Sequence, residues 1–194
     1  MAARPPYVFI SYRHEPNTTG IAAQFAQQLR MYQKGLGLAG VFMDKDKLVA
    51  GSVWRAEVEA ALAQATHFVV MLSNGYWLSD ECHKELATAV GRYRDGGADD
   101  MRLLFVQVQT IAPDLLVFDQ DAADANVAFV NRELGKAVPG KAVPQLEKVG
   151  DLQFLGPFDA YARLVRLPPE SDPLLGDALH QLVMRLKDTL PAKS

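Results

Sequence analysis

The stretch HFVVML, residues 67–72, is apolar almost throughout. A short run without polar alternation is typical of a strand that other elements cover on both faces, as in a parallel sheet. Three further runs rich in β-branched and aromatic residues lie before and after it, at residues 7–10, 41–43 and 103–108. We therefore interpret residues 67–72 as a central strand of a parallel sheet.

Helical patterns separate these four strands. Apolar residues recur at helical spacing over residues 21–32, 53–65 and 82–93. Glycines at 35, 37 and 40 end the first of these helices. The alternation of strand and helix predicts a flavodoxin-like α/β fold, with a parallel sheet between two layers of helices. Residues suited to capping the three helices precede them, namely Thr18 or Thr19, Ser52 and Ser79.

The pattern weakens after residue 109. Residues 109–170 mix apolar and acidic residues with several prolines, and we expect an elaborated segment with a short helix near residues 127–134. Residues 164–167 are the candidate fifth strand of the sheet. Asp172 and a run of leucines at helical spacing predict a last helix over residues 172–190. A chain of 194 residues fits one domain, 1–194, with this five-stranded sheet.

Composition excludes several classes of function. The net charge is −3, whereas a surface that follows nucleic-acid phosphates usually shows a basic excess. The single cysteine and four histidines without ligand-like spacing predict no metal site and no intrachain disulfide. The apolar stretch at residues 7–10 is too short for a signal sequence, and no stretch approaches a membrane span. We expect a cytoplasmic protein that does not bind membranes.

Polar residues follow each of the first three strands. In open parallel sheets, ligands bind beyond the carboxyl ends of the strands, so these groups are expected to meet at one edge. They are Ser11, Tyr12, Arg13 and His14 after the first strand, Asp44 to Lys47 after the second, and Ser73 to Tyr76 after the third.

Glu85 adds a carboxylate to this edge. It lies in the second turn of the helix after residues 67–72, about 60° from the direction of Cys82 at the margin of the apolar stripe. A carboxylate that points partly toward the core beside a cleft is a candidate functional group. The alternative is a solvated glutamate that pairs with Lys84 or Arg92.

Three blocks of sequence resemble the TIR domain family. VFISYR, residues 8–13, is similar to its first box. Residues 41–51 are similar to its second strand and BB loop. The pattern Ser73-x-x-Tyr76-x-x-Ser79-x-x-Cys82-x-x-Glu85 is similar to the third box of enzymatic members. The blocks occur in the family's order between residues 7 and 90, and the C-terminal part matches only in outline.

The resemblance implies a fold, an activity and a catalytic residue. TIR domains have a flavodoxin-like fold, and some hydrolyse NAD⁺ with a required glutamate at the position of Glu85. The resemblance therefore implies an NAD⁺ hydrolase that releases nicotinamide and ADP-ribose or cyclic ADP-ribose. It takes NAD⁺ as substrate and needs no separate cofactor. Many relatives carry a tryptophan at or next to the position of Glu81, and the nearest tryptophan here is Trp77.

The resemblance also implies partners. TIR enzymes commonly act after self-association, in which the BB loop, residues 44–51, completes the site of a neighbouring copy. A role in immune or antiphage signalling follows from the resemblance, with a sensor domain or partner protein that these residues do not identify.

The ligand groups are assigned around Glu85. Arg13 is the leading donor for the diphosphate, with a surface cation as the alternative. Lys45 and Lys47 belong to a loop that could close over the site or bind a neighbouring subunit, and solvated loop lysines are the alternative for both. Tyr12, Trp54 and Trp77 compete to stack on a ring of the ligand. Cys82 is not expected to be a nucleophile, because it lies on the apolar stripe. The full set of ligand-binding candidates is Ser11, Tyr12, Arg13, Asp44, Lys47, Ser73, Trp77 and Cys82.

Other functions compete with this interpretation. A non-catalytic TIR adaptor that binds other TIR domains is the main alternative, and an enzyme similar to nucleoside deoxyribosyltransferases shares the fold and the glycosidic chemistry. A phosphoacceptor receiver would need clustered carboxylates after the first strand, where this chain has residues 11–14, SYRH. A dehydrogenase of the Rossmann type would need a glycine-rich motif there.

Overall fold

A parallel sheet forms the centre of the molecule. The computed structural model describes residues 4–44, 52–73, 75–76, 79–108, 165–168 and 170–190. Neighbouring strands pair in parallel in the order β2-β1-β3-β4-β5. The strands are β1 (Tyr7–Tyr12), β2 (Gly40–Met43), β3 (His67–Leu72), β4 (Arg102–Gln107) and β5 (Val165–Arg166).

The strand order is the one found in flavodoxin-like sheets, where the chain reverses direction across the sheet between β1 and β3. The predicted parallel α/β fold is confirmed over β1 to β4. The fifth strand was expected at residues 164–167 and consists of two residues, which pair with Val106 and Gln107 of β4. Residues 109–164, including the expected helix near 127–134, lie outside the described residues.

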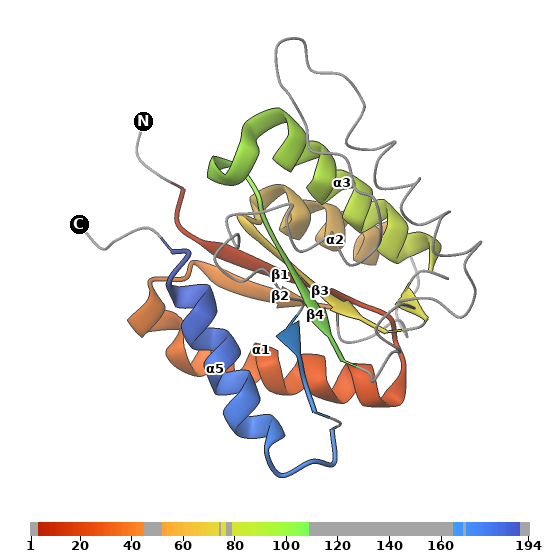
Figure 1. The fold of residues 1–194 in the computed structure, drawn as a ribbon. Helices are drawn as coiled ribbons and strands as arrows, with labels where there is room; N and C mark the ends of the chain where they lie inside the picture. The colour runs from red at the N-terminus through yellow and green to blue at the C-terminus, as the bar shows by residue number, and fades with distance from the viewer. Residues whose placement is uncertain are drawn as a thin grey trace.

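Helices cover both faces of the sheet (Figure 1). One layer holds α1 (Pro16–Leu36) and α5 (Leu175–Lys187), and the other holds α2 (Ser52–Gln64) and α3 (Asp80–Gly96), which is followed by the short η2 (Gly97–Asp99). Side chains alternate along the strands, so Phe9 and Phe68 join the core cluster beside α2 and α3, while Val8 and Val69 join the cluster beside α1 and α5.

The first strand is longer than predicted. It was expected to end at Ile10, yet Ser11 and Tyr12 continue it and pair with Val70 and Met71 of β3. Both added residues are buried. From the sequence, a serine and a tyrosine after a short apolar run were interpreted as the start of a loop. They stay in the sheet because β3 is long enough to offer them backbone partners.

Two helix starts differ from the predictions. Glu15, with an extended backbone, is the N-cap of α1, rather than Thr18 or Thr19, because Pro16 suits the first helical position, where an N–H has no partner in the helix. The helix α5 begins at Leu175, although Asp172 still accepts a hydrogen bond from the Leu174 N–H at 2.8 Å. The end of α1 is as predicted: Gly37 has φ 72°, which glycine adopts without steric cost.

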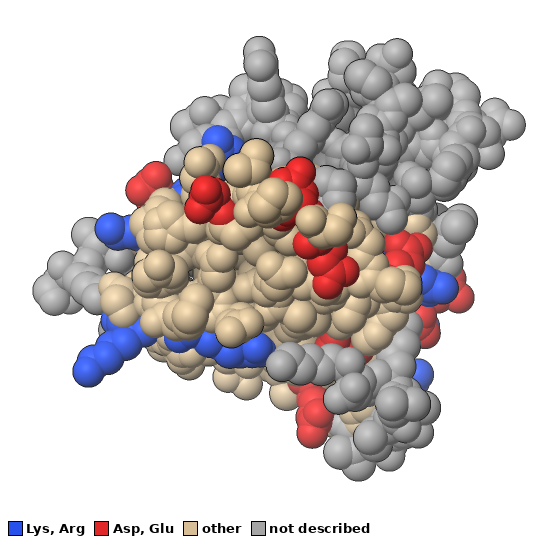
Figure 2. Space-filling model, turned by 90° about the horizontal axis from the view of Figure 1, so that it is seen from below, with Lys and Arg blue, Asp and Glu red and all other residues tan. Residues whose placement is uncertain are grey.

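The face below the sheet, where α1 and α5 lie, carries uncharged side chains over its middle and charged ones around its edges (Figure 2). Tyr32 on α1 is partly exposed and its ring lies 5.5 Å from that of His180 on α5. Among the described helices, none combines the length and the apolar content that crossing a lipid bilayer requires.

His67 makes the stability of this fold depend on pH. The side chain is 3 % exposed at the start of β3, and burial, together with the charge of Arg102, lowers its pKa from 6.5 to about 4. Between pH 6.5 and about pH 4, His67 therefore binds a proton in the unfolded chain but not in the folded chain. We expect the free energy of unfolding to fall by about 3 kcal/mol as the pH drops from 6.5 to 4.

Urea unfolding at several pH values tests this expectation. Replacement of His67 by glutamine, which does not titrate, should flatten the pH dependence of the unfolding free energy in this range. His180→Gln is the matched control, because His180 is exposed and should leave the slope unchanged. If the unfolding free energy of His67→Gln still fell with decreasing pH in this range, groups other than His67 would be responsible for the pH dependence.

Candidate functional site

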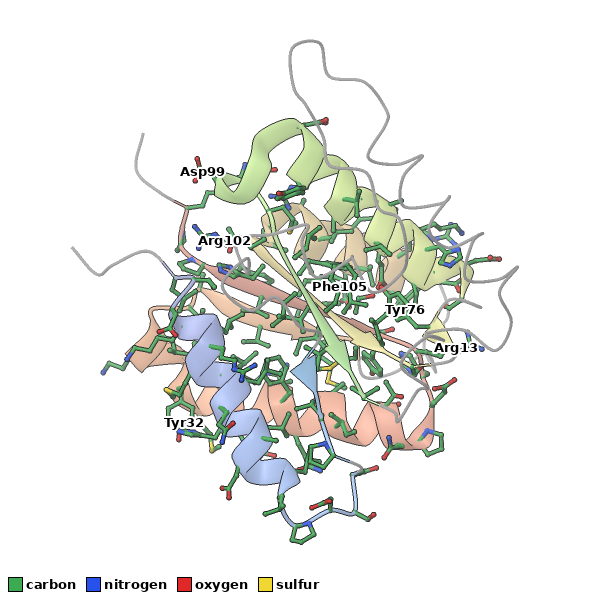
Figure 3. All side chains as sticks on the ribbon, in the orientation of Figure 1. Arg13, Tyr32, Tyr76, Asp99, Arg102 and Phe105 are labelled. Atoms are coloured by element: carbon green, nitrogen blue, oxygen red, sulfur yellow. The ribbon has the colours of Figure 1, made fainter. Side chains whose placement is uncertain are left out.

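The carboxyl ends of β1 and β3 lie side by side, with Tyr12 opposite Met71. Arg13 and Tyr76, which follow these strands, lie at the same end of the sheet (Figure 3). Arg102 and Asp99 lie at the opposite end. The predicted meeting of polar residues from separate loops at one edge is confirmed for the turns after β1 and β3.

Glu85 points toward this edge. Ser79 caps α3 as predicted, its Oγ accepting from the Cys82 N–H at 3.4 Å, and Glu85 follows in the second turn. The half-buried Glu85 carboxylate accepts a hydrogen bond of 2.6 Å from Ser11 Oγ through Oε2. The predicted orientation of Glu85, toward the core and the polar edge, is therefore confirmed.

The alternative pairing of Glu85 with Arg92 is not among the described contacts. Arg92 lies two turns further along α3 and donates to both carboxylate oxygens of Asp100 at 2.9 Å, and to the Leu62 carbonyl at 2.7 Å. These hydrogen bonds lower the pKa of Asp100. The guanidinium of Arg92 thus ties the far end of α3 to α2 and η2, away from Glu85.

A buried tyrosine lies behind the Glu85 carboxylate. The hydroxyl groups of Tyr76 and Ser11 are 2.9 Å apart, and both side chains are almost completely buried. Burial, with the nearby Cys82 and Glu85 charges, raises the pKa of Tyr76 well above its usual value, so the phenol keeps its proton. Tyr76, Ser11 and Glu85 therefore form a chain of hydrogen bonds that joins three separate elements.

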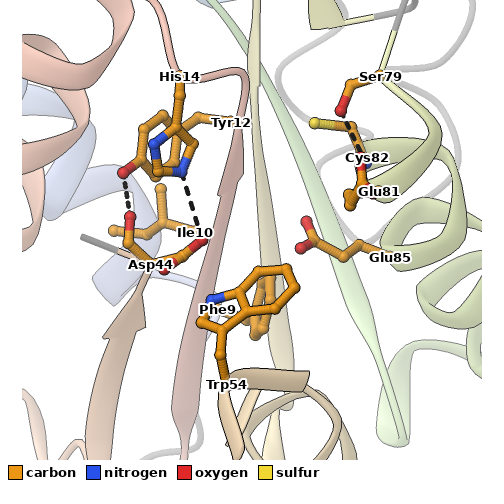
Figure 4. Close-up of a pocket in the computed structure, with 10 residues that line it drawn as sticks. All are labelled: Phe9, Ile10, Tyr12, His14, Asp44, Trp54, Ser79, Glu81, Cys82 and Glu85. Atoms are coloured by element: carbon orange, nitrogen blue, oxygen red, sulfur yellow. Dashed lines mark hydrogen bonds and ion pairs between the residues drawn. The ribbon is translucent and has the colours of Figure 1, made fainter. Parts of the chain in front are cut away.

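Glu85 also lines a cleft between α3 and the end of β1 (Figure 4). The space between its walls is about 310 Å³, including the part open to solvent. The lining residues are Phe9, Ile10, Tyr12, His14, Asp44, Trp54, Ser79, Glu81, Cys82 and Glu85.

The wall opposite Glu85 is built around Asp44. The Tyr12 hydroxyl donates to the Asp44 carbonyl, and His14 Nε2 lies 3.3 Å from the Asp44 carboxylate. The rings of Tyr12 and His14 stack with their centroids 4.8 Å apart. These contacts hold the residue at which the predicted loop 44–51 begins, while residues 45–51 lie outside the described residues.

The cleft has a negative character among its described lining residues. Glu81, Glu85 and Asp44 contribute carboxylates, and His14 is the one lining side chain in this part of the chain that can carry a positive charge. Such a lining favours a cationic group in the ligand over a phosphate. A phosphate would be held outside the described lining, where Arg13 follows β1.

The structure separates the predicted site residues into groups. Tyr12, Asp44, Cys82 and Glu85 line the cleft. Ser11 lies behind Glu85 instead, and Ser73 is buried, with its carbonyl accepting from the Tyr76 N–H at 3.1 Å. Arg13 is half-buried and does not line the cleft. Lys47 and Trp77 lie outside the described residues.

The sequence missed other residues of the cleft. Trp54 was one of three candidates to stack on the ligand but was left out of the ligand-binding set, and it packs against the core while also lining the cleft. Its position in the first turn of α2 was a usable signal, because helices that follow parallel strands begin at the ligand-binding edge. His14 was expected at this edge without a role in ligand binding, Phe9 and Ile10 were expected only as part of the first strand, and Glu81 was expected to replace the usual tryptophan of the family.

The described ranges contain no cluster of three or more potential metal ligands. Comparison with known proteins identifies one family: the model described as TIR domain matches residues 8–136, more than half of the 194-residue chain. The match extends from the second residue of β1 through β4 and includes every residue that lines the cleft. No curated protein matches the chain.

Proposed function

The chain belongs to the TIR domain family, and from this premise we propose that it cleaves the nicotinamide–ribose bond of NAD⁺ with Glu85 as the catalytic carboxylate. The family contains both NAD⁺ hydrolases and adaptors that bind other TIR domains. The single observation that carries the enzymatic alternative is the position of Glu85, which lines the cleft while Ser11 holds one of its oxygens at 2.6 Å.

The reaction needs negative potential beside the ribose. When the bond breaks, its electron pair moves to the nicotinamide nitrogen, and positive charge develops at the anomeric carbon. Nicotinamide leaves as a neutral molecule, so its nitrogen needs no general acid. The carboxylate of Glu85 stabilises the charge at the anomeric carbon and binds the ribose hydroxyls.

The product depends on the nucleophile. Water that adds to the anomeric carbon and loses a proton gives ADP-ribose, whereas attack by the adenine of the same molecule gives cyclic ADP-ribose. Glu85 can accept the proton of the attacking water, because its carboxylate lines the cleft in which the reaction is proposed to take place. Both products are consistent with this site.

The cleft supports a position for the nicotinamide riboside half of the substrate. The carboxylates of its lining, Asp44, Glu81 and Glu85, attract the cationic nicotinamide of NAD⁺. The rings of Tyr12, His14 and Trp54 offer stacking surfaces for that nicotinamide. The diphosphate then extends toward Arg13, and Lys47 is a further candidate donor for it.

Self-assembly is the proposed means of activation. In the family, loop 44–51 of one copy completes the site of the next, and here Asp44 forms one wall of the cleft at the start of that loop. We propose that the chain acts in immune or antiphage signalling, with a sensor on the same protein or on a partner. Glu81 lines the cleft near the usual tryptophan position and favours the adaptor as the second candidate.

An NAD⁺ assay at increasing protein concentration separates the two candidates. We expect release of nicotinamide together with ADP-ribose or its cyclic form, at a rate per monomer that rises with concentration or when the protein is clustered on beads. Chromatography of the nucleotides measures both products. An adaptor would release no nicotinamide at any concentration, and that result in the clustered sample would overturn the proposed enzyme.

A further inference from the structure

The hydrogen-bond chain behind the cleft includes Tyr76, a residue that does not line the cleft. We propose that Tyr76 is a positioning residue for Glu85, acting through the Ser11 hydroxyl. This inference rests on the proposed function of Glu85 and adds a role for two buried hydroxyl groups outside the cleft lining. Neither Tyr76 nor Ser11 is among the residues that line the cleft.

The direction of each hydrogen bond follows from the available protons. An ionised carboxylate only accepts, so the one proton of the Ser11 hydroxyl is donated to Glu85 Oε2 at 2.6 Å. Ser11 Oγ must then accept in its contact with Tyr76, 2.9 Å away. Tyr76 is completely buried and retains its phenolic proton, so it is the donor at the start of the chain.

With these two hydrogen bonds, the proton of the Ser11 hydroxyl has one favourable orientation, which points toward Glu85. The accepted bond from Tyr76 polarises Ser11 and strengthens its donation to the carboxylate, as in other chains of hydrogen bonds in a low-dielectric interior. Ser11 holds Oε2 of Glu85 from the sheet side, while the Glu85 side chain also lines the cleft. The carboxylate is thereby oriented before substrate binds, with no adjustment needed during the reaction.

The three residues come from rigid neighbouring elements. Ser11 lies in β1, Tyr76 lies in the turn directly after β3, and Glu85 lies in α3. Backbone pairing of β1 with β3 fixes the distance between the first two, because Ser11 lies opposite Val70. The Tyr76 N–H donates to the Ser73 carbonyl at 3.1 Å, which fixes the turn itself. Through these contacts the position of the Glu85 side chain is fixed relative to the central sheet.

Tyr76→Phe tests the proposal by removing one hydroxyl group and leaving the buried ring. We expect kcat for nicotinamide release to fall about 10- to 100-fold, as for a small misplacement of a reacting group. The KM for NAD⁺ should stay within about twofold, because the lost contact acts on the carboxylate orientation and not on uniform substrate binding. Tyr7→Phe is the matched control, since Tyr7 packs against the same core cluster from the other end of β1.

A double-mutant cycle tests the route through Ser11. Ser11→Ala should lower kcat at least as much as Tyr76→Phe, and the double variant should be no slower than Ser11→Ala alone, because the effect of Tyr76 passes through Ser11. Two effects that multiply would overturn the proposed route. An unchanged kcat in Tyr76→Phe would overturn the role of Tyr76.

A readout without substrate separates this proposal from the proposed activity. NMR of ¹³C-labelled glutamate follows the titration of the Glu85 carboxyl carbon, with Glu85→Gln to assign the signal. Loss of the Tyr76 hydroxyl weakens the hydrogen bond to the ionised form, so the titration midpoint should move to higher pH in Tyr76→Phe and stay in place in Tyr7→Phe. A shifted midpoint in a protein that does not cleave NAD⁺ would support the positioning of Glu85 and reject the proposed enzyme. An unshifted midpoint would reject the positioning, whatever the activity.

Discussion

Glu85→Gln is expected to lower the rate of nicotinamide release from NAD⁺ about a thousandfold, which is the order of effect seen when one preorganised charge-stabilising group is removed. The amide has nearly the shape of the carboxylate, and its oxygen can still accept from Ser11 Oγ. The fold and the wall of the cleft should therefore be preserved. What disappears is the negative charge beside the anomeric carbon, together with the group that accepts a proton from water.

Glu81→Gln is the matched control for this prediction. It removes the same charge one helical turn earlier on α3, at another residue of the cleft lining. Glu81 is exposed, so water screens its charge, and we expect a reduction of only severalfold in the same chromatographic assay. Equal turnover in Glu85→Gln and the unchanged protein would remove Glu85 from the mechanism. If Glu81→Gln lowered the rate of nicotinamide release as much as Glu85→Gln, the rate would depend on the net charge of the cleft and not on Glu85 in particular.

Phe68→Ala is expected to lower the free energy of unfolding by about 3–5 kcal/mol. Phe68 is fully buried in β3, and its ring stacks on that of Phe9 with centroids 5.4 Å apart. Phe9 in turn stacks on Phe42 at 5.0 Å, so one row of rings crosses β3, β1 and β2. Removal of the central-strand ring leaves a cavity that the surrounding strands and helices can fill only in part.

Urea unfolding followed by circular dichroism measures this loss. Tyr32→Ala is the control, because Tyr32 is an aromatic residue on α1 with 38 % of its surface exposed, and it should change the unfolding free energy by less than about 1 kcal/mol. A similarly small change in Phe68→Ala would mean that the row of rings is not the tightly packed core of the sheet. Since Phe9 also lines the cleft, a folded Phe68→Ala protein should show weaker substrate binding as well.

The local elements could be predicted from the sequence because their signals come from residues close together in the chain. The apolar run at 67–72 coincides with β3, and the serine before α3 forms the expected cap. The starts of α1 and α5 could not be placed to the residue, because several neighbouring positions offer a suitable cap and the local backbone decides among them. The fifth strand was located correctly and overestimated in length, since pairing with β4 determines how far it extends.

By itself, the sequence determined the class of fold, the succession of strands and helices, and the edge of the sheet at which Glu85 lies, since hydrophobic periodicity at short range specifies each of these. Only the tertiary structure decided that Ser11 belongs to β1 and binds Glu85, that Tyr76 lies behind it, and that Trp54 joins the cleft. The physical reason is separation along the chain: the partners of the Ser11–Glu85 hydrogen bond are 74 positions apart in the sequence, and those of the Ser11–Tyr76 bond are 65 positions apart. No local pattern encodes such a contact, and the pairing of β1 with β3 brings these residues together.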